Sequence, residues 1–239
     1  IIKFDSNYKE TSKQLSIAIN EPIYENGIRF FVEKNYMLAY KNWNQIYTRE
    51  PNYKDVKNKL QQALNERYKE GSYYLMQENF KEAALAFSEV KAINSNYLEV
   101  KNLFKEATCE PIYRTALREI KSEKCRTAYY SLEDIIQNFD SYKNANELKQ
   151  QALKCAEYPI IVESYRTTNT NGFENTIQNA IIEDILASNN PFIQVIRGNN
   201  NNASPYYKLD ETTQNSSQFK RYISNSYTNT KAKAVLTLH

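Results

Sequence analysis

Few side chains in this chain have the types and spacing needed for catalysis. A hydroxyl or thiol nucleophile activated by imidazole needs a histidine, and the single histidine is the last residue, His239. Adjacent carboxylates such as Glu183 and Asp184, or Glu133 and Asp134, point to different faces of a helix. Neither GxGxxG nor GxxxxGK[ST] is present, so no nucleotide-binding loop is indicated. We therefore expect no enzymatic activity and no cofactor.

The cysteines Cys109, Cys125 and Cys155 form no zinc or redox motif, because CxxC is absent and no histidine lies near them. Cys125 lies fifteen residues before Asp140 and Cys155 fifteen residues after it. In an antiparallel helical hairpin that turns at Asp140, the two cysteines come level. They either pack as small buried hydrophobic residues or form a disulfide in an oxidising compartment.

Core-type residues recur along the first two thirds of the chain with a period of 44 and then 45 residues. A repeat of this length is typical of an array of helical hairpins, which offers a surface for partners. Four positions keep the spacing in three copies: Tyr24, Tyr68 and Tyr113; Ala39, Ala83 and Ala128; Trp43, Phe87 and Leu132; Ile46, Val90 and Ile135.

Within one copy, Gly27 and Ala39 occupy positions where two antiparallel helices can approach closely, while Trp43 and Ile46 fill the space between hairpins. The small, aromatic and turn residues of the three copies then fall at the same offsets: Gly27, Phe30, Ala39, Trp43, Ile46 and Pro51; Gly71, Tyr74, Ala83, Phe87, Val90 and Ser95; Ala116, Glu119, Ala128, Leu132, Ile135 and Asp140. This pattern resembles the tetratricopeptide family over about residues 21 to 153.

The resemblance implies a mainly α fold, an α-solenoid of about three hairpins over 21–157. The expected repeats are 21–64, 65–108 and 109–153, and residues 1–20 form an N-terminal segment or partial helix. Residues 21–153 should form six helices in three antiparallel pairs, with turns near Asn35, Pro51, Asn79, Ser95, Ser122 and Asp140.

After Cys155 the pattern changes to that of a small α/β domain over 158–239, expected to be incomplete. The apolar segments Tyr158–Ser164, Phe192–Ile196 and Ala234–Leu238 predict strands, and apolar residues every four positions predict a helix over 173–187. A helical patch at 219–223 completes a βαβαβ order, which favours parallel pairing. This order resembles the α/β domain of curli-secretion-type lipoproteins. Ligands of such sheets bind at the strands' carboxyl ends, here 165–172, which includes Gly172, and 197–202, which begins at Arg197.

Composition restricts the setting of the protein. The net charge is +3 with both signs mixed along the helices, so nucleic-acid binding is not favoured. No apolar run approaches the ~20 residues of a membrane span, and a signal peptide or lipid anchor ahead of Ile1 is left open. Abundant Tyr, Asn and Lys in long hairpins resemble Bacteroidota envelope proteins. The resemblance implies the periplasm, with or without association with the outer membrane; the alternative is the cytoplasm.

In the tetratricopeptide family, the first helices of the hairpins line the concave, partner-binding side. The residues of this chain at those positions are Tyr24, Ile28 and Phe31; Tyr68, Ser72 and Leu75; Tyr113, Leu117 and Ile120. The tyrosines either anchor an extended partner or pack between repeats. A second set, Tyr53, Tyr97 and Tyr142, resembles the family's turn-closing residue. The Lys and Asn of the family's chaperone-tail clamp are replaced by Tyr24 and Ile28, so that ligand is not expected.

The sequence thus predicts a non-enzymatic scaffold for protein partners, as a subunit of an envelope or secretion assembly. The alternative is a ligand-sensing or enzymatic module in the C-terminal domain.

Overall fold

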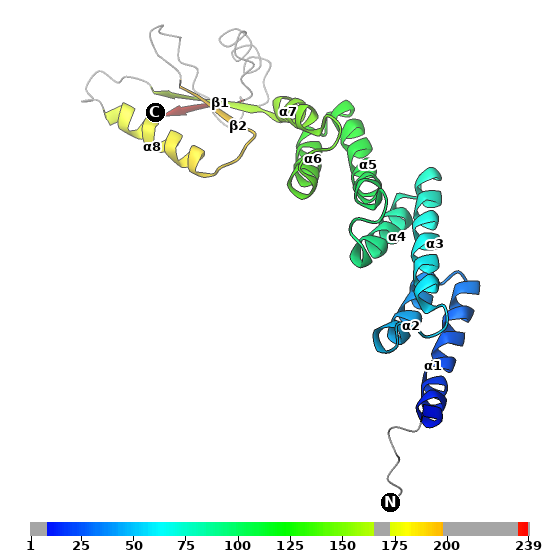
Figure 1. The fold of residues 1–239 in the computed structure, drawn as a ribbon. Helices are drawn as coiled ribbons and strands as arrows, with labels where there is room; N and C mark the ends of the chain where they lie inside the picture. The colour runs from blue at the N-terminus through cyan, green and yellow to red at the C-terminus, as the bar shows by residue number, and fades with distance from the viewer. Residues whose placement is uncertain (1–8, 165–172, 198–233, 239) are drawn as a thin grey trace, which may run out of the picture. The chain divides into compact units, whose positions relative to one another are not determined.

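The computed structural model describes residues 9–164, 173–197 and 234–238. Consecutive helices from Lys9 to Ala156 pack against one another as hairpins (Figure 1). The helices are α1 (Lys9–Val32), α2 (Tyr36–Arg49), α3 (Val56–Met76), α4 (Phe80–Ile93), α5 (Val100–Lys121), α6 (Cys125–Phe139) and α7 (Ala145–Ala156). The chain divides into two compact units, Ile1–Ile112 and Tyr113–His239.

All six predicted turns lie between helices of the structure, and no strand occurs within residues 21–153. The number of helices differs from the prediction, because the segment after the Asp140 turn forms a helix of its own, α7. Helix α1 also begins earlier than the repeat, at Lys9, since nothing in residues 9–20 interrupts it. The result is a stack of helical hairpins of the tetratricopeptide-like type.

The turns inside the hairpins share one backbone geometry. Lys34, Glu78 and Glu123 occupy equivalent positions and have φ values of 61°, 56° and 60°. The amide of the next residue bonds back five residues, as from Asn35 N to Phe30 O at 2.8 Å. This is the helix C-terminal motif in which a left-handed residue satisfies the last carbonyl groups. The tight turn sends the second helix back along the first.

The core of the first unit lies between α1, α2 and α3. Trp43, Ile46 and Ala39 of α2 are fully buried against Val56 and Ala63 of α3, in one apolar cluster. Gly27 of α1 lies against the Trp43 ring, and a Cβ at this position would lie 2.6 Å from Trp43 Cε2. The predicted close approach of the two helices at Gly27 therefore exists and depends on a missing side chain, but the residue that meets Gly27 is Trp43 and not the predicted Ala39.

The second unit joins α6 and α7 to a parallel sheet. Strands β1 (Tyr158–Ser164), β2 (Ile193–Arg197) and β3 (Ala234–Leu238) have the order β2-β1-β3, and α8 (Phe173–Ala187) packs against β1 and β2. Cys125 and Cys155 form a disulfide between α6 and α7, with their Cα atoms 5.8 Å apart. The buried Phe192 packs beside it. The predicted patch at 219–223 lies outside the described residues.

None of the described helices combines the length and apolarity that a membrane crossing requires.

Candidate protein-binding surface

The predicted anchor tyrosines lie mostly inside the helical stack. Tyr24 and Tyr113 are only 7% and 9% exposed, and Tyr68 is half-buried. The Tyr24 hydroxyl donates to Asp55 and the Tyr113 hydroxyl to Asn144, both in the turn that follows the hairpin's second helix. Their rings therefore have a packing role. Direct contact of these tyrosines with a partner stays a prediction.

The other predicted partner-binding residues are half-buried. Ile28 and Phe31 pack on the α1–α2 core, where the Phe31 ring lies 5.7 Å from the ring of Trp43. Leu75 packs on the α3–α4 core, and the Ser72 hydroxyl donates to the Tyr68 carbonyl. The remaining two, Leu117 and Ile120, lie half-buried on α5. The structure thus brings each set together within its own hairpin, with the greater part of each side chain turned inward.

The second tyrosine set closes the turns between hairpins. Tyr53, Tyr97 and Tyr142 make edge-to-face contacts with the first set, at centroid distances of 6.2, 5.6 and 5.8 Å. The Tyr53 hydroxyl donates to Glu21 at 2.6 Å, and the Tyr97 hydroxyl to Asn65 at 3.3 Å. Paired rings of this geometry contribute beyond their buried area. Each turn is therefore fixed to the preceding first helix.

A cation completes two of these turns. The Lys54 ammonium lies 4.5 Å from the Tyr24 ring centroid, and the Lys143 ammonium 5.1 Å from the Tyr113 ring centroid. Both lysines have positive φ, as does Leu98 at the equivalent place. A cation over an aromatic face is an attractive arrangement. Lys54 and Lys143 thus help to hold each turn against the first helix of the preceding hairpin.

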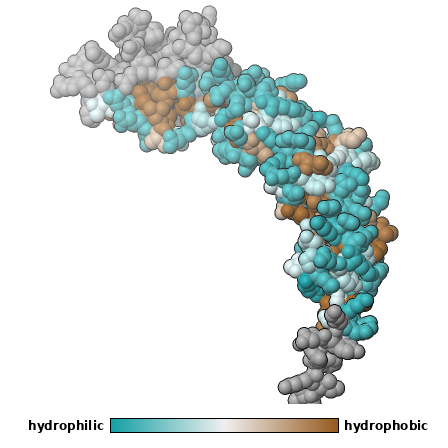
Figure 2. Space-filling model, in the orientation of Figure 1, coloured by the Kyte–Doolittle hydropathy of each residue, from teal (hydrophilic) through white to brown (hydrophobic). Residues whose placement is uncertain are grey.

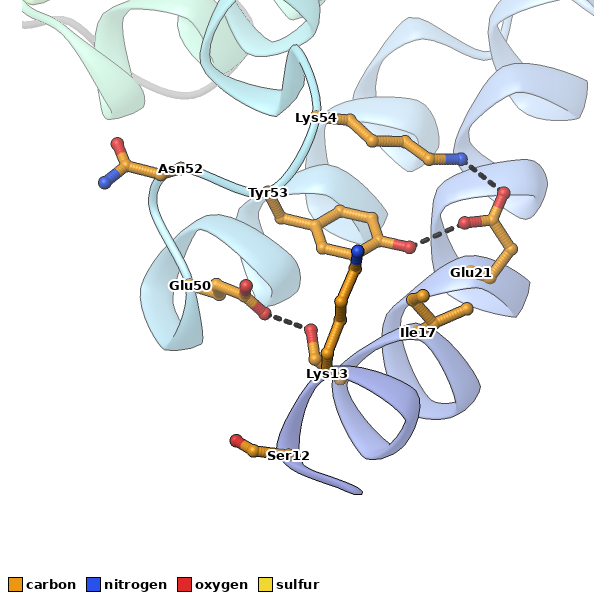
Figure 3. Close-up of a pocket in the computed structure, with 9 residues that line it drawn as sticks. Ser12, Lys13, Ile17, Glu21, Glu50, Asn52, Tyr53 and Lys54 are labelled. Carbon is orange, nitrogen blue, oxygen red and sulfur yellow. Dashed lines mark hydrogen bonds and ion pairs between the residues drawn. The ribbon is translucent and has the colours of Figure 1, made fainter. Parts of the chain in front are cut away.

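A groove of about 530 Å³ lies between the first half of α1 and the α2–α3 turn. Figure 3 shows Lys54 and Tyr53 pointing toward Glu21, and Glu50 toward α1. The Ser16 hydroxyl and the Asn20 amide both donate to Glu50. These polar groups thus bond to one another across the groove, and their hydrogen bonds hold the α2–α3 turn against α1.

The electrostatics of the groove follow from these bonds. The hydrogen bond from Lys54, followed by that from Tyr53, lowers the pKa of Glu21. Burial, together with the bond to Glu21, raises the pKa of Tyr53 to about 12. Burial and the bond to Asp55 also raise the pKa of Tyr24 well above its usual value. At neutral pH the carboxylate is therefore charged and both phenols are neutral donors.

One ion-pair group crosses from α3 to α4. Arg67 donates to Glu70 and to Glu89, each at 2.6 Å, and its side chain is largely buried. Burial disfavours the charged form, but the two carboxylates outweigh it and raise the pKa of Arg67. The group fixes the pairing of α3 with α4 in the middle copy.

The first helices expose apolar side chains that are not among the partner-binding residues predicted from the sequence. Val32 ends α1 and Met76 ends α3 at the equivalent position, and they are 76% and 80% exposed. Tyr73 lies one turn before Met76 on α3 and is 60% exposed. A signal for Tyr73 existed, because the other copies carry the charged residues Arg29 and Arg118 at that position. On the face drawn in Figure 2, hydrophobic patches are separated by hydrophilic surface.

The alternative ligand site was predicted at the carboxyl ends of the strands. Its first segment, 165–172, which includes Gly172, lies outside the described residues. The Arg197 backbone ends β2, and 198–202 lie beyond it. Within the described residues, no group of three or more His, Cys, Asp or Glu side chains is placed to hold a metal ion.

A scan against protein-family models gave no match for this chain, and a search of curated proteins found no similar sequence.

Proposed function

We propose that the protein is a non-enzymatic scaffold that binds a protein partner through the exposed side of its first helices. The observation that carries this proposal is a stack of helical hairpins whose first helices present large apolar side chains, Tyr73 and Met76 on α3 and Val32 on α1. Aromatic residues and methionine are enriched where proteins bind one another. Tyr73 and Met76 lie three residues apart, so one partner segment can contact both.

The proposed setting is an envelope assembly in the periplasm. The disulfide between Cys125 and Cys155 supports an oxidising compartment, because such bonds are rare where thiols are kept reduced. The resemblance in composition to Bacteroidota envelope proteins, and of the C-terminal order to curli-secretion-type lipoproteins, agrees with this setting. Alkylating free thiols in cells of the native source before lysis tests it. Both cysteines should be protected, and their labelling would argue for the cytoplasm.

Photo-cross-linking tests the binding surface. A photoreactive amino acid at Tyr73 or Met76 should give a covalent adduct with one defined protein in cells of the native source. Leu85 on α4 and Tyr130 on α6 are matched controls, because they are also exposed but lie on second helices. Adducts from the control positions alone would move the interface to the second helices. A chain without adducts from any of the four positions would contradict the scaffold proposal.

A further inference from the structure

Helix α1 carries an apolar stripe that the first unit leaves uncovered. Leu15 and Ile19 are 60% and 45% exposed, and Ala18 between them is exposed as well. Pro22 continues the stripe, since residues at i, i+3, i+4 and i+7 share one face of a helix. This face is opposite to the side that lines the groove of Figure 3, where Ile17 and Glu21 lie.

The sequence around this stripe is repeated on another helix. Residues 6–24 align without a gap with residues 95–113, which include the first half of α5. In this alignment Thr11 corresponds to Val100, Leu15 to Phe104 and Ala18 to Ala107. The residues shared by both segments are Ser6, Asn7, Tyr8, Glu10, Ala18, Glu21, Pro22, Ile23 and Tyr24.

On α5 the equivalent face is covered by the second helix of the preceding hairpin. Val100 and Ala107 are buried in one cluster with the α4 residues Ala83, Phe87 and Val90. The half-buried Phe104 packs on the same cluster, and the ammonium group of Lys91 of α4 lies 3.6 Å from its ring centroid.

Helix α3 repeats this arrangement. Its residues Val56 and Ala63 are buried together with Ala39, Trp43 and Ile46 of α2. On two of the three first helices, α3 and α5, this face is thus covered by the second helix of the preceding hairpin. The covering helices share one pattern: a small residue, a large aromatic residue four positions later and a β-branched residue three positions after that. These residues are Ala39, Trp43 and Ile46 in α2, and Ala83, Phe87 and Val90 in α4. Figure 1 shows the first turns of α1, in dark blue, extending beyond the end of α2.

We propose that the face formed by Leu15, Ala18 and Ile19 binds an amphipathic helix whose apolar residues follow the same pattern as those of α2 and α4. The interface would continue the one already present twice in the chain, with Leu15 in the place of Phe104 and Ala18 permitting the close approach that Ala107 permits on α5. This surface lies on a different part of the chain from Tyr73 and Met76, so the proposal stands independently of the proposed function.

A grafted helix tests the proposal in the full chain. In this variant a second copy of residues 80–94, which contain α4, replaces residues 1–5. The copied α4 is then followed by residue 6 just as α4 is followed by the equivalent residue 95 ahead of α5. A Leu15→Cys reporter should then react with iodoacetamide at least about tenfold more slowly than without the graft, as expected when an exposed thiol becomes buried. The rate at Ile17→Cys, on the groove side of the same helix, should change less than about twofold.

A second graft, in which the copied Ala83, Phe87 and Val90 are replaced by serine, is the matched control and should leave the Leu15→Cys rate unchanged. The proposal is overturned if both grafts protect Leu15→Cys equally, or if neither protects it. It is also overturned if the ungrafted chain sediments as a dimer that Leu15→Glu converts to a monomer, because the occupant would then be a second copy.

Discussion

Substitution of Gly27 by alanine tests the packing between α1 and α2 at the contact of Gly27 with the Trp43 ring. A Cβ at this position would lie 2.6 Å from Cε2 and 2.7 Å from Cδ1 of Trp43. The Trp43 ring is fully buried, and its Nε1 donates to the Tyr24 carbonyl at 3.2 Å. The ring therefore has no exposed space to turn into, and the two helices must move apart to accommodate the methyl group.

The expected magnitude is the balance of two effects. Overpacking a core typically costs about 1–3 kcal/mol, whereas replacing glycine by alanine within a helix gains about 1 kcal/mol. Because the contact is with a buried ring, we expect Gly27→Ala to lower the free energy of unfolding by about 1–2 kcal/mol. Gly71→Ala is the matched control. Its Cβ would meet Ala86 and Phe87 atoms at 3.0 Å, so the two effects should nearly cancel.

Urea unfolding followed by circular dichroism measures both variants against the parent chain. A double variant, Gly27→Ala with Trp43→Phe, separates the clash from other effects, because the smaller ring should make Gly27→Ala less costly than it is beside tryptophan. A Gly27→Ala variant as stable as the parent, or one whose loss of stability is the same beside phenylalanine, would show that no steric clash with Trp43 occurs.

Three further predictions concern the turns and the disulfide. Replacing both Cys125 and Cys155 by serine should lower the free energy of unfolding by about 3–4 kcal/mol, because the bond closes a loop with a sequence separation of 30; a loss below about 1 kcal/mol in urea unfolding would contradict this. The raised pKa of Tyr53, about 12, adds stability that is complete below the unfolded pKa of about 10 and is lost as pH rises toward 12. Unfolding midpoints between these pH values should therefore fall less steeply in Tyr53→Phe, and identical slopes would exclude the effect. Lys34→Gly should stabilise the chain by about 0.5–1 kcal/mol, because φ at this residue is 61° and glycine adopts that geometry without a steric cost; a loss of stability in thermal unfolding would count against it.

The turns could be predicted because their causes are local. The period of the repeat places Asn35, Asn79 and Lys124 at the same point of each hairpin, and the left-handed residue before each of them needs only the preceding turn of helix. The level positions of Cys125 and Cys155 likewise follow from counting along two antiparallel helices around one turn. The count of helices was one too low because three full repeats were assumed, although the hairpin that brings Cys125 level with Cys155 already requires a helix after Asp140, which is α7.

The orientation of the tyrosines could not be predicted from spacing. Periodicity places Tyr24, Tyr68 and Tyr113 at one equivalent position, but it does not say which neighbour covers them. The partner of the Tyr24 hydroxyl, Asp55, lies thirty-one residues further along the chain. Burial at this position depends on how the following turn folds back over the helix. The exposure of Tyr73 and Met76 also depends on a turn. On α3 the turn between α4 and α5 contacts Tyr68 through Tyr97, whereas Tyr73 and Met76, further along the helix, stay exposed.

We propose that a partner binds the exposed side of the first helices. The most direct test is isothermal titration of the partner found by cross-linking into the parent chain, Tyr73→Glu and Leu85→Glu. A charge at an interface anchor should weaken binding at least about tenfold, whereas the same charge on the second helix α4 should leave affinity unchanged. Unchanged affinity for Tyr73→Glu, in a variant with the parent's helicity, would show that the partner does not bind through Tyr73.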